Sequence, residues 1–121
     1  MQPRILNYVP EREYFFREGC FINELSNSDS DPALSIARVR LMPGDQTRWH
    51  YLEEREERYV ILQGTGEVEI GDLQVTRVCM GDVVLIPAGC RQRIRNRGSD
   101  ELIFLALCTP RFEEVDYRDL G

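Results

Sequence analysis

Lysine is absent from this chain of 121 residues, and histidine occurs only once, as His50. All 15 basic side chains are therefore arginines. Without lysine there is no amine to form a Schiff base with a carbonyl substrate, and no P-loop lysine to bind a nucleotide phosphate. With one histidine, a single chain cannot build a zinc site of three histidines. Any catalytic imidazole has to be that of His50.

The chain also lacks a long apolar run, a basic surplus and a signal-peptide pattern near its start. The longest apolar run, residues 102–108, is far too short to cross a bilayer. A formal net charge of −6 and a pI near 4.8 disfavour binding to nucleic acids or anionic membranes. These absences predict a cytoplasmic protein. No Cys-x-x-Cys pair occurs, and we expect reduced, buried thiols at Cys20, Cys79, Cys90 and Cys108.

Short β-favouring runs, separated by Gly, Pro, Asn and Asp, fill most of the chain. They predict an all-β sandwich or barrel in a single domain of residues 1–121. The barrel core is expected at about 35–108, with an N-terminal arm at 1–25 and an acidic, irregular tail at 109–121. The predicted strands are Gly19–Leu25, Ser35–Met42, Arg48–Leu52, Glu57–Gln63, Glu67–Ile70, Gln74–Val78, Val83–Ile86, Cys90–Arg95 and Leu102–Cys108.

Alternation along two of these strands assigns their side chains to faces. In residues 57–63, the side chains of Glu57, Tyr59 and Ile61 share one face. The charged run 53–56 just before them is expected to be a solvated loop. In residues 90–97, four arginines share one face, which we expect to be an ion-paired outer surface. The opposite face of that strand carries Cys90, Gln92, Ile94 and Asn96.

Two motifs with fixed spacing lie inside the predicted core. The first runs Gly44, five residues, His50, one residue, Leu52, four residues, Glu57, six residues, Gly64. The second runs Gly81, five residues, Pro87, one residue, Gly89, two residues, Gln92, three residues, Asn96. Together they resemble the two motifs of the cupin superfamily and match it at eight of ten fixed positions. The resemblance implies a double-stranded β-helix, or jelly-roll, barrel.

Both mismatches fall where the resemblance implies metal ligands, since cupins hold a divalent metal with three histidines and one glutamate. Leu52 and Gln92 stand at two of the histidine positions. His50 and Glu57 remain as standard ligands, and Gln92 can add an amide oxygen. This reduced set would hold Mn, Fe or Ni rather than Zn. The alternative is a metal-free barrel in which His50 and Glu57 hydrogen-bond each other in a pocket.

Neighbouring residues complete the candidate site. Tyr59 follows Glu57 on the inward face and is predicted to supply a catalytic hydroxyl near His50. Arg48 shares the His50 face and is expected at the pocket mouth, where it would meet an anionic ligand. The remaining pocket residues are predicted to be Leu52, Cys90 and Ile94.

Three functions agree with these features, and the sequence leaves open whether the protein is an enzyme. The first is a metal-dependent oxygenase, isomerase or decarboxylase that acts on a small polar or anionic substrate. The second is a metal-free module that binds a small molecule. The third is a metal-free epimerase or isomerase with His50 as its base, as in some sugar-modifying cupins.

The apolar side chains predict how the chain associates. Both faces of residues 57–63 carry apolar residues, and the segment 14–22 is rich in aromatic ones. We therefore expect a homodimer in which the N-terminal arm pairs with or covers the partner's sheet.

Overall fold

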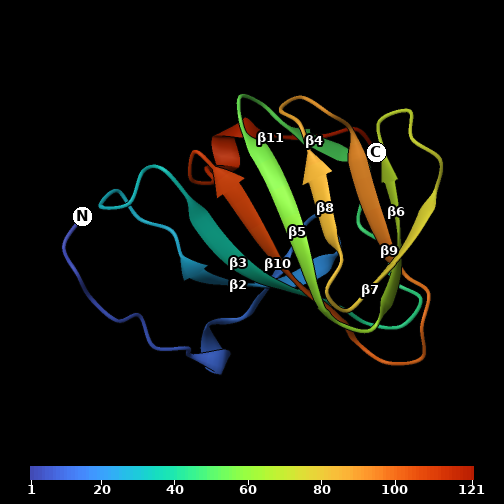
Figure 1. Cartoon of the computed structure of the whole chain (residues 1–121), viewed down its shortest axis with the longest axis horizontal. Coiled ribbons are helices and arrows are strands. Elements are labelled where there is room, and N and C mark those ends of the chain that lie inside the picture. The colour runs from blue at the N-terminus through green and yellow to red at the C-terminus, as the bar shows by residue number, and fades with distance from the viewer.

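The computed structural model describes residues 1–121 as two antiparallel sheets that face each other (Figure 1). The six-stranded sheet has the order β1-β2-β3-β10-β5-β8, and the five-stranded sheet has the order β11-β4-β9-β6-β7. The all-β prediction is confirmed. No helix of this structure has the length and apolar character needed to cross a membrane. The elements are η1 (Pro10–Arg12), β1 (Tyr14–Phe16), β2 (Cys20–Ser26), β3 (Ser35–Leu41), β4 (His50–Leu52), β5 (Glu56–Gln63), β6 (Thr65–Ile70), β7 (Thr76–Cys79), β8 (Val83–Ile86), β9 (Gln92–Asn96), β10 (Leu102–Thr109), η2 (Glu114–Asp116) and β11 (Tyr117–Asp119).

Both chain ends add strands that the sequence analysis misses. The prediction of an irregular tail is wrong for Tyr117–Asp119, because these residues form β11 and pair with β4. At the other end, β1 pairs with β2, and β2 pairs with β3. The aromatic segment of the arm therefore packs on its own chain, while its contact with a partner subunit stays a prediction.

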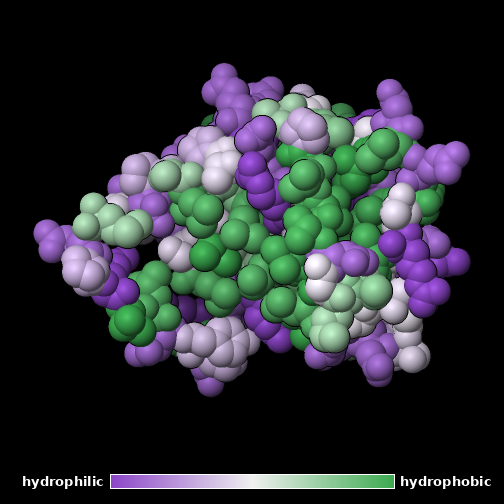
Figure 2. All heavy atoms as spheres, in the orientation of Figure 1, coloured by the Kyte–Doolittle hydropathy of each residue, from purple (hydrophilic) through white to green (hydrophobic).

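The outer face of the six-stranded sheet carries a patch of exposed apolar side chains. Its strand β10 lies between β3 and β5 and is apolar over nearly its whole length, so it carries apolar side chains on both faces. Leu62 of β5 and Val83 and Leu85 of β8 add exposed side chains to the outer face. Figure 2 shows the hydrophobic area that spreads over the strands of this sheet.

The outer face of the five-stranded sheet is charged instead. β9 pairs with β6 so that Arg93 lies opposite Glu69, and Arg95 opposite Glu67. Arg93 Nε donates to Glu69 Oε2 at 2.6 Å, and Arg97 pairs with Glu67 at 3.3 Å. The predicted ion-paired arginine face is confirmed.

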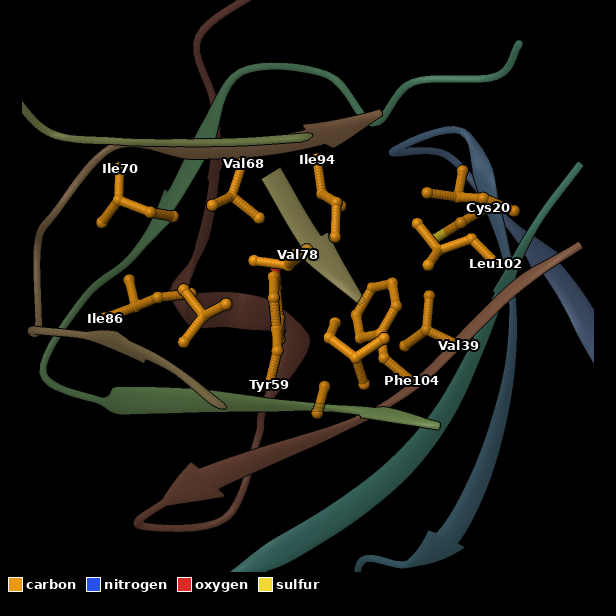
Figure 3. Close-up of a cluster of buried hydrophobic side chains, with 14 residues drawn as sticks. Cys20, Val39, Tyr59, Val68, Ile70, Val78, Ile86, Ile94, Leu102 and Phe104 are labelled. Carbon is orange, nitrogen blue, oxygen red and sulfur yellow. The ribbon is translucent and has the colours of Figure 1, made fainter. Parts of the chain in front are cut away.

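The core fills the space between the two sheets (Figure 3). Tyr59 points from β5 toward the opposite sheet, and its ring centre lies 4.5 Å from that of Phe104 on β10. The inward face that alternation predicts for β5 is confirmed, since Glu57, Tyr59 and Ile61 are all buried. A smaller cluster continues the core toward the chain ends and consists of Phe16, Leu52, Cys108 and Tyr117.

Gly64 allows the tight connection between β5 and β6. Its φ is +86°, and a Cβ atom there would lie 2.6 Å from the main-chain oxygen of Glu101. Gly81 shares the left-handed backbone, with φ +92°, but a Cβ atom there would meet nothing within 4 Å. An alanine at Gly81 would therefore meet backbone strain alone, whereas an alanine at Gly64 would meet both backbone strain and a steric clash.

We expect Gly81→Ala to lower the free energy of unfolding by about 1–2 kcal/mol, the cost of a left-handed residue with a side chain. Gly64→Ala adds a clash with the main chain of Glu101 and should cost clearly more. Urea unfolding of both variants measures the difference. Equal losses would show that the close approach to Glu101 relaxes at little cost.

Candidate functional site

His50 begins β4 and lies directly opposite Gln92 of β9. Its side chain is 2% exposed, and its Nδ1 atom lies 2.7 Å from the main-chain oxygen of Arg48. Because a carbonyl oxygen only accepts hydrogen bonds, Nδ1 carries the hydrogen in this contact. Nε2 is therefore the ring nitrogen that is free to take up a proton.

The turn between β1 and β2 brings Glu18 to this nitrogen. Gly19 adopts φ +105°, and the Arg48 N–H donates to the main-chain oxygen of Glu18 at 2.8 Å. Glu18 Oε2 lies 3.5 Å from His50 Nε2, and Glu18 Oε1 accepts from the Cys20 thiol at 3.4 Å. Nothing in the sequence points to Glu18, because this residue lies outside both motifs and no local signal marks it as buried.

A hydrogen-bonded chain crosses the barrel beside His50. The Tyr59 hydroxyl donates to Gln92 Oε1, and Gln92 Nε2 donates to Glu57 Oε1 at 2.8 Å. The Cys108 thiol lies 3.7 Å from Glu57 Oε2. Glu57 therefore bonds Gln92 rather than His50, and the direct hydrogen bond expected for a metal-free pocket is not formed.

Burial makes Glu57 a weaker acid than an exposed glutamate. It raises the pKa of this carboxyl to about 7, and the charge of Glu18 adds to the rise. The charge of His50 and the hydrogen bonds from Gln92 and Cys108 act in the opposite direction without cancelling burial. A carboxyl that titrates near neutral pH can both donate and accept protons under ordinary conditions.

Tyr117 enters the site from β11 and stacks on His50, with ring centres 5.1 Å apart. Arg55 holds the segment that precedes Tyr117: its Nε donates to the Arg111 main-chain oxygen at 2.6 Å, and its guanidinium also pairs with Asp116. Arg55 is only 8% exposed, so the prediction of a solvated loop is wrong at this residue, because the C-terminal segment folds over it. The hydroxyl of Tyr117 is buried and has no hydrogen-bond partner.

These side chains surround a cavity of about 50 Å³ between the sheets. Because one water molecule needs about 10–15 Å³ of such space, the cavity holds on the order of four waters. Two of its lining residues, Tyr14 and Glu24, are exposed and mark its open end. The other polar and aromatic residues of the lining include Glu18, His50, Glu57, Tyr59, Phe16, Phe104, Phe112 and Tyr117.

The structure brings only some of the predicted pocket residues to this cavity. Leu52 lines it. Arg48 does not: the strand begins at His50, so alternation does not extend back to Arg48, whose Nε donates to Asp119 at the surface at 2.8 Å. Ile94 belongs to the main core, and Cys90 packs against that core from a partly exposed position.

The predicted metal ligands His50, Glu57 and Gln92 are neighbours at one end of the barrel, and the Gln92 amide bonds other side chains there. The oxygen of the Gln92 side chain accepts from Tyr59, and its nitrogen donates to Glu57. Leu52 offers no donor atom. No three His, Cys, Asp or Glu side chains lie close enough together to hold a metal ion.

A family model described as a cupin domain matches residues 37–108, which is more than half of the chain. No curated protein matches the chain. Among solved structures, the oxalate decarboxylase of Lactobacillus farciminis, a formate complex, is similar with 23% identity and a TM-score of 0.76. The match covers 89% of this chain but only 33% of the decarboxylase, so the chain spans about a third of that protein.

Two smaller structures match over nearly their whole length. A Klebsiella pneumoniae protein described as uncharacterized, with a double-stranded β-helix domain, has 17% identity and a TM-score of 0.78, over 99% of both chains. Pac13 of Streptomyces, described as a unique nucleoside dehydratase, has 17% identity and a TM-score of 0.77, over 97% of this chain and 92% of Pac13. Likeness at such identity shows the fold, and the predicted double-stranded β-helix is confirmed.

The raised pKa of Glu57 makes stability depend on pH. The folded protein binds this proton more tightly than the unfolded chain, so its contribution to stability is complete below the ordinary pKa of 4.5 and is lost as pH rises through about 7. At about 1.4 kcal/mol per pKa unit, the loss is about 3 kcal/mol. Glu57→Gln cannot titrate at this position and does not suffer this loss. We therefore expect the free energy of unfolding of the variant, relative to that of the wild type, to increase as pH rises through about 7.

Urea unfolding of both proteins at several pH values from about 5 to 8 measures this gain. A difference between the two proteins that stays constant with pH would contradict a raised pKa at Glu57.

Proposed function

Since the chain belongs to the cupin family, we propose that its barrel is a metal-independent acid–base site in which His50 exchanges a proton with a small ligand. The observation that carries the proposal is the 2.7 Å contact between His50 Nδ1 and the Arg48 main-chain oxygen. It fixes the tautomer and leaves Nε2 of a cavity-lining histidine as a base.

Two buried carboxyl groups, those of Glu18 and Glu57, have different roles in the proton transfer. When Nε2 of His50 takes a proton from the ligand, the imidazolium gains a negative partner in Glu18, whose Oε2 lies 3.5 Å away. Glu57, with a pKa of about 7, returns a proton to the ligand at another position. Abstraction at one atom and return at another is the chemistry of isomerases and dehydratases, and return to the opposite face of the same carbon is that of epimerases.

Tyr59 acts as a positioning residue in this proposal, not as the catalytic hydroxyl that the sequence predicts. Burial raises its pKa well above the ordinary value of 10, so the hydroxyl keeps its proton. That proton is donated to Gln92, which in turn holds the Glu57 carboxyl. The chain of three side chains orients Glu57 toward the cavity that it lines.

A module that binds a small molecule without a reaction is the second candidate, and the small cavity agrees with it as well as with the acid–base function. Proton exchange separates the two. We propose to incubate the protein in D₂O with a panel of small ketones, aldehydes, hydroxy acids and amines, and to follow the loss of C–H signals by NMR. A ligand that binds without any exchange identifies a binding module.

We expect exchange with the wild type and a rate lower by about 100-fold or more with His50→Asn. The asparagine amide keeps a donor for the Arg48 main-chain oxygen but has no basic nitrogen. Exchange at the wild-type rate in His50→Asn would contradict the role of His50.

The same assay tests the absence of a metal. Wild-type protein treated with EDTA should keep its full rate, and metal analysis of untagged protein should find far less than one ion per chain. Loss of exchange with EDTA and recovery with Mn²⁺ would restore the metal-dependent alternative.

We further propose that the chain forms a homodimer through the apolar face of the six-stranded sheet (Figure 2). Leu62, Val83 and Leu85 on this face are 43%, 56% and 67% exposed. Exposed apolar side chains that gather on one face indicate an interaction surface. Two further apolar side chains, Ile5 and Leu6, lie on the N-terminal segment, which borders a groove also lined by Leu62.

Light scattering at micromolar concentration should give twice the chain mass of 14.1 kDa. Leu85→Glu should give the monomer, because a charge in an apolar interface is costly to desolvate. Val115→Glu is the matched control: Val115 is 71% exposed in η2, which is not part of this sheet, and the variant should remain a dimer. A monomeric wild type would contradict the proposal.

A further inference from the structure

Acidic side chains outnumber basic ones in the lining of the cavity. Three carboxyl side chains, those of Glu18, Glu24 and Glu57, line it, and His50 is its only basic residue. None of the 15 arginines lines it. Arg48, expected to meet an anionic ligand here, is paired with Asp119 at the surface. An anion would meet repulsion in this cavity, so the expectation of an anionic ligand loses its support.

Aromatic rings form much of the cavity wall. Phe16 packs edge-on against Tyr117, with ring centres 5.2 Å apart, and against Phe112 at 6.4 Å. The faces of such rings attract cations. Arg17 already makes this contact, since its guanidinium carbon lies 4.6 Å from the centre of the Tyr117 ring.

Three buried oxygen atoms of the site lack a strong hydrogen-bond donor. The nearest basic atom to Glu18 Oε2 is His50 Nε2, at 3.5 Å, and Glu57 Oε2 has only the Cys108 thiol, at 3.7 Å. The Tyr117 hydroxyl has no partner at all, although the residue is 4% exposed and lines the cavity. Burial and then the charge of Glu18 raise the pKa of this hydroxyl, which places it in the same negative region.

We propose that the cavity binds the ammonium group of a small primary alkylamine. An ammonium brings three N–H donors for Glu18, Glu57 and Tyr117, and a positive charge for the aromatic wall. The volume of about 50 Å³ limits the enclosed part to a few non-hydrogen atoms. The inference rests on the cavity of the proposed function and names its ligand class, but it does not depend on catalysis.

NMR titration of the wild type with propylamine, 1-propanol and propionate tests the charge preference directly. The three compounds have similar size and carry a positive, no and a negative charge near pH of about 8. We expect propylamine to bind with a Kd in the range of about 0.1–10 mM, and the other two about tenfold or more weakly. Propanol or propionate that binds as tightly as propylamine would overturn the proposal.

Two variants locate the ammonium. Glu18→Gln should weaken propylamine binding about tenfold, and Tyr117→Phe about threefold, since the first removes a charge and the second only a hydroxyl. Glu56→Gln is the matched control, because this exposed residue of β5 has the same charge and lies outside the cavity. Wild-type affinity in both cavity variants would overturn the proposal. Circular dichroism and thermal melting check that each variant folds.

The two proposals fail in different ways. If His50 drives exchange of a neutral compound while propylamine does not bind, the ammonium site is overturned and the acid–base function stands. If propylamine binds but no compound of the panel exchanges a proton, the ammonium site stands and the acid–base function is overturned.

Discussion

A polar side chain buried between the two sheets has to find its partner inside the barrel, and the structure depends on this constraint. Asn96 shows how completely it can be met: its amide donates to the main-chain oxygens of Leu41 and Asp100, and its own oxygen accepts from the Gly98 N–H. The path from Tyr59 through Gln92 to Glu57 follows the same rule at the other end of β9. The exceptions gather around the cavity, and a site that leaves buried donors or acceptors without partners is suited to a ligand that completes them.

Segments near both ends of the chain supply side chains around His50. The motif strands supply His50 and Glu57, whereas Glu18 comes from the turn before β2, and Tyr117 comes from β11. Each is held by contacts between segments far apart in the chain: the Arg48 N–H with the Glu18 oxygen, and Arg55 with the segment that precedes Tyr117. The site is therefore assembled only when both chain ends pack on the barrel.

Apolar packing and acid–base chemistry are linked in this interior. Leu52 stands where the resemblance implies a second histidine, and it packs with Phe16, Cys108 and Tyr117. The same apolar surroundings raise the pKa of Glu57, because water cannot stabilise its charge. With leucine at this position, the site combines a tightly packed apolar end with a carboxyl whose pKa is about 7.

The sequence by itself determined the fold and most of the barrel strands with their faces, because alternation and turn residues are local signals and the two motifs carry eight of ten expected residues. It also identified His50, Glu57 and Gln92 as neighbours. Only the tertiary structure decided that Glu18 and Tyr117 join them, that Arg48 leaves the pocket and that Arg55 is buried. These outcomes depend on contacts between distant segments and on where a strand begins, and neither local periodicity nor motif spacing carries that information.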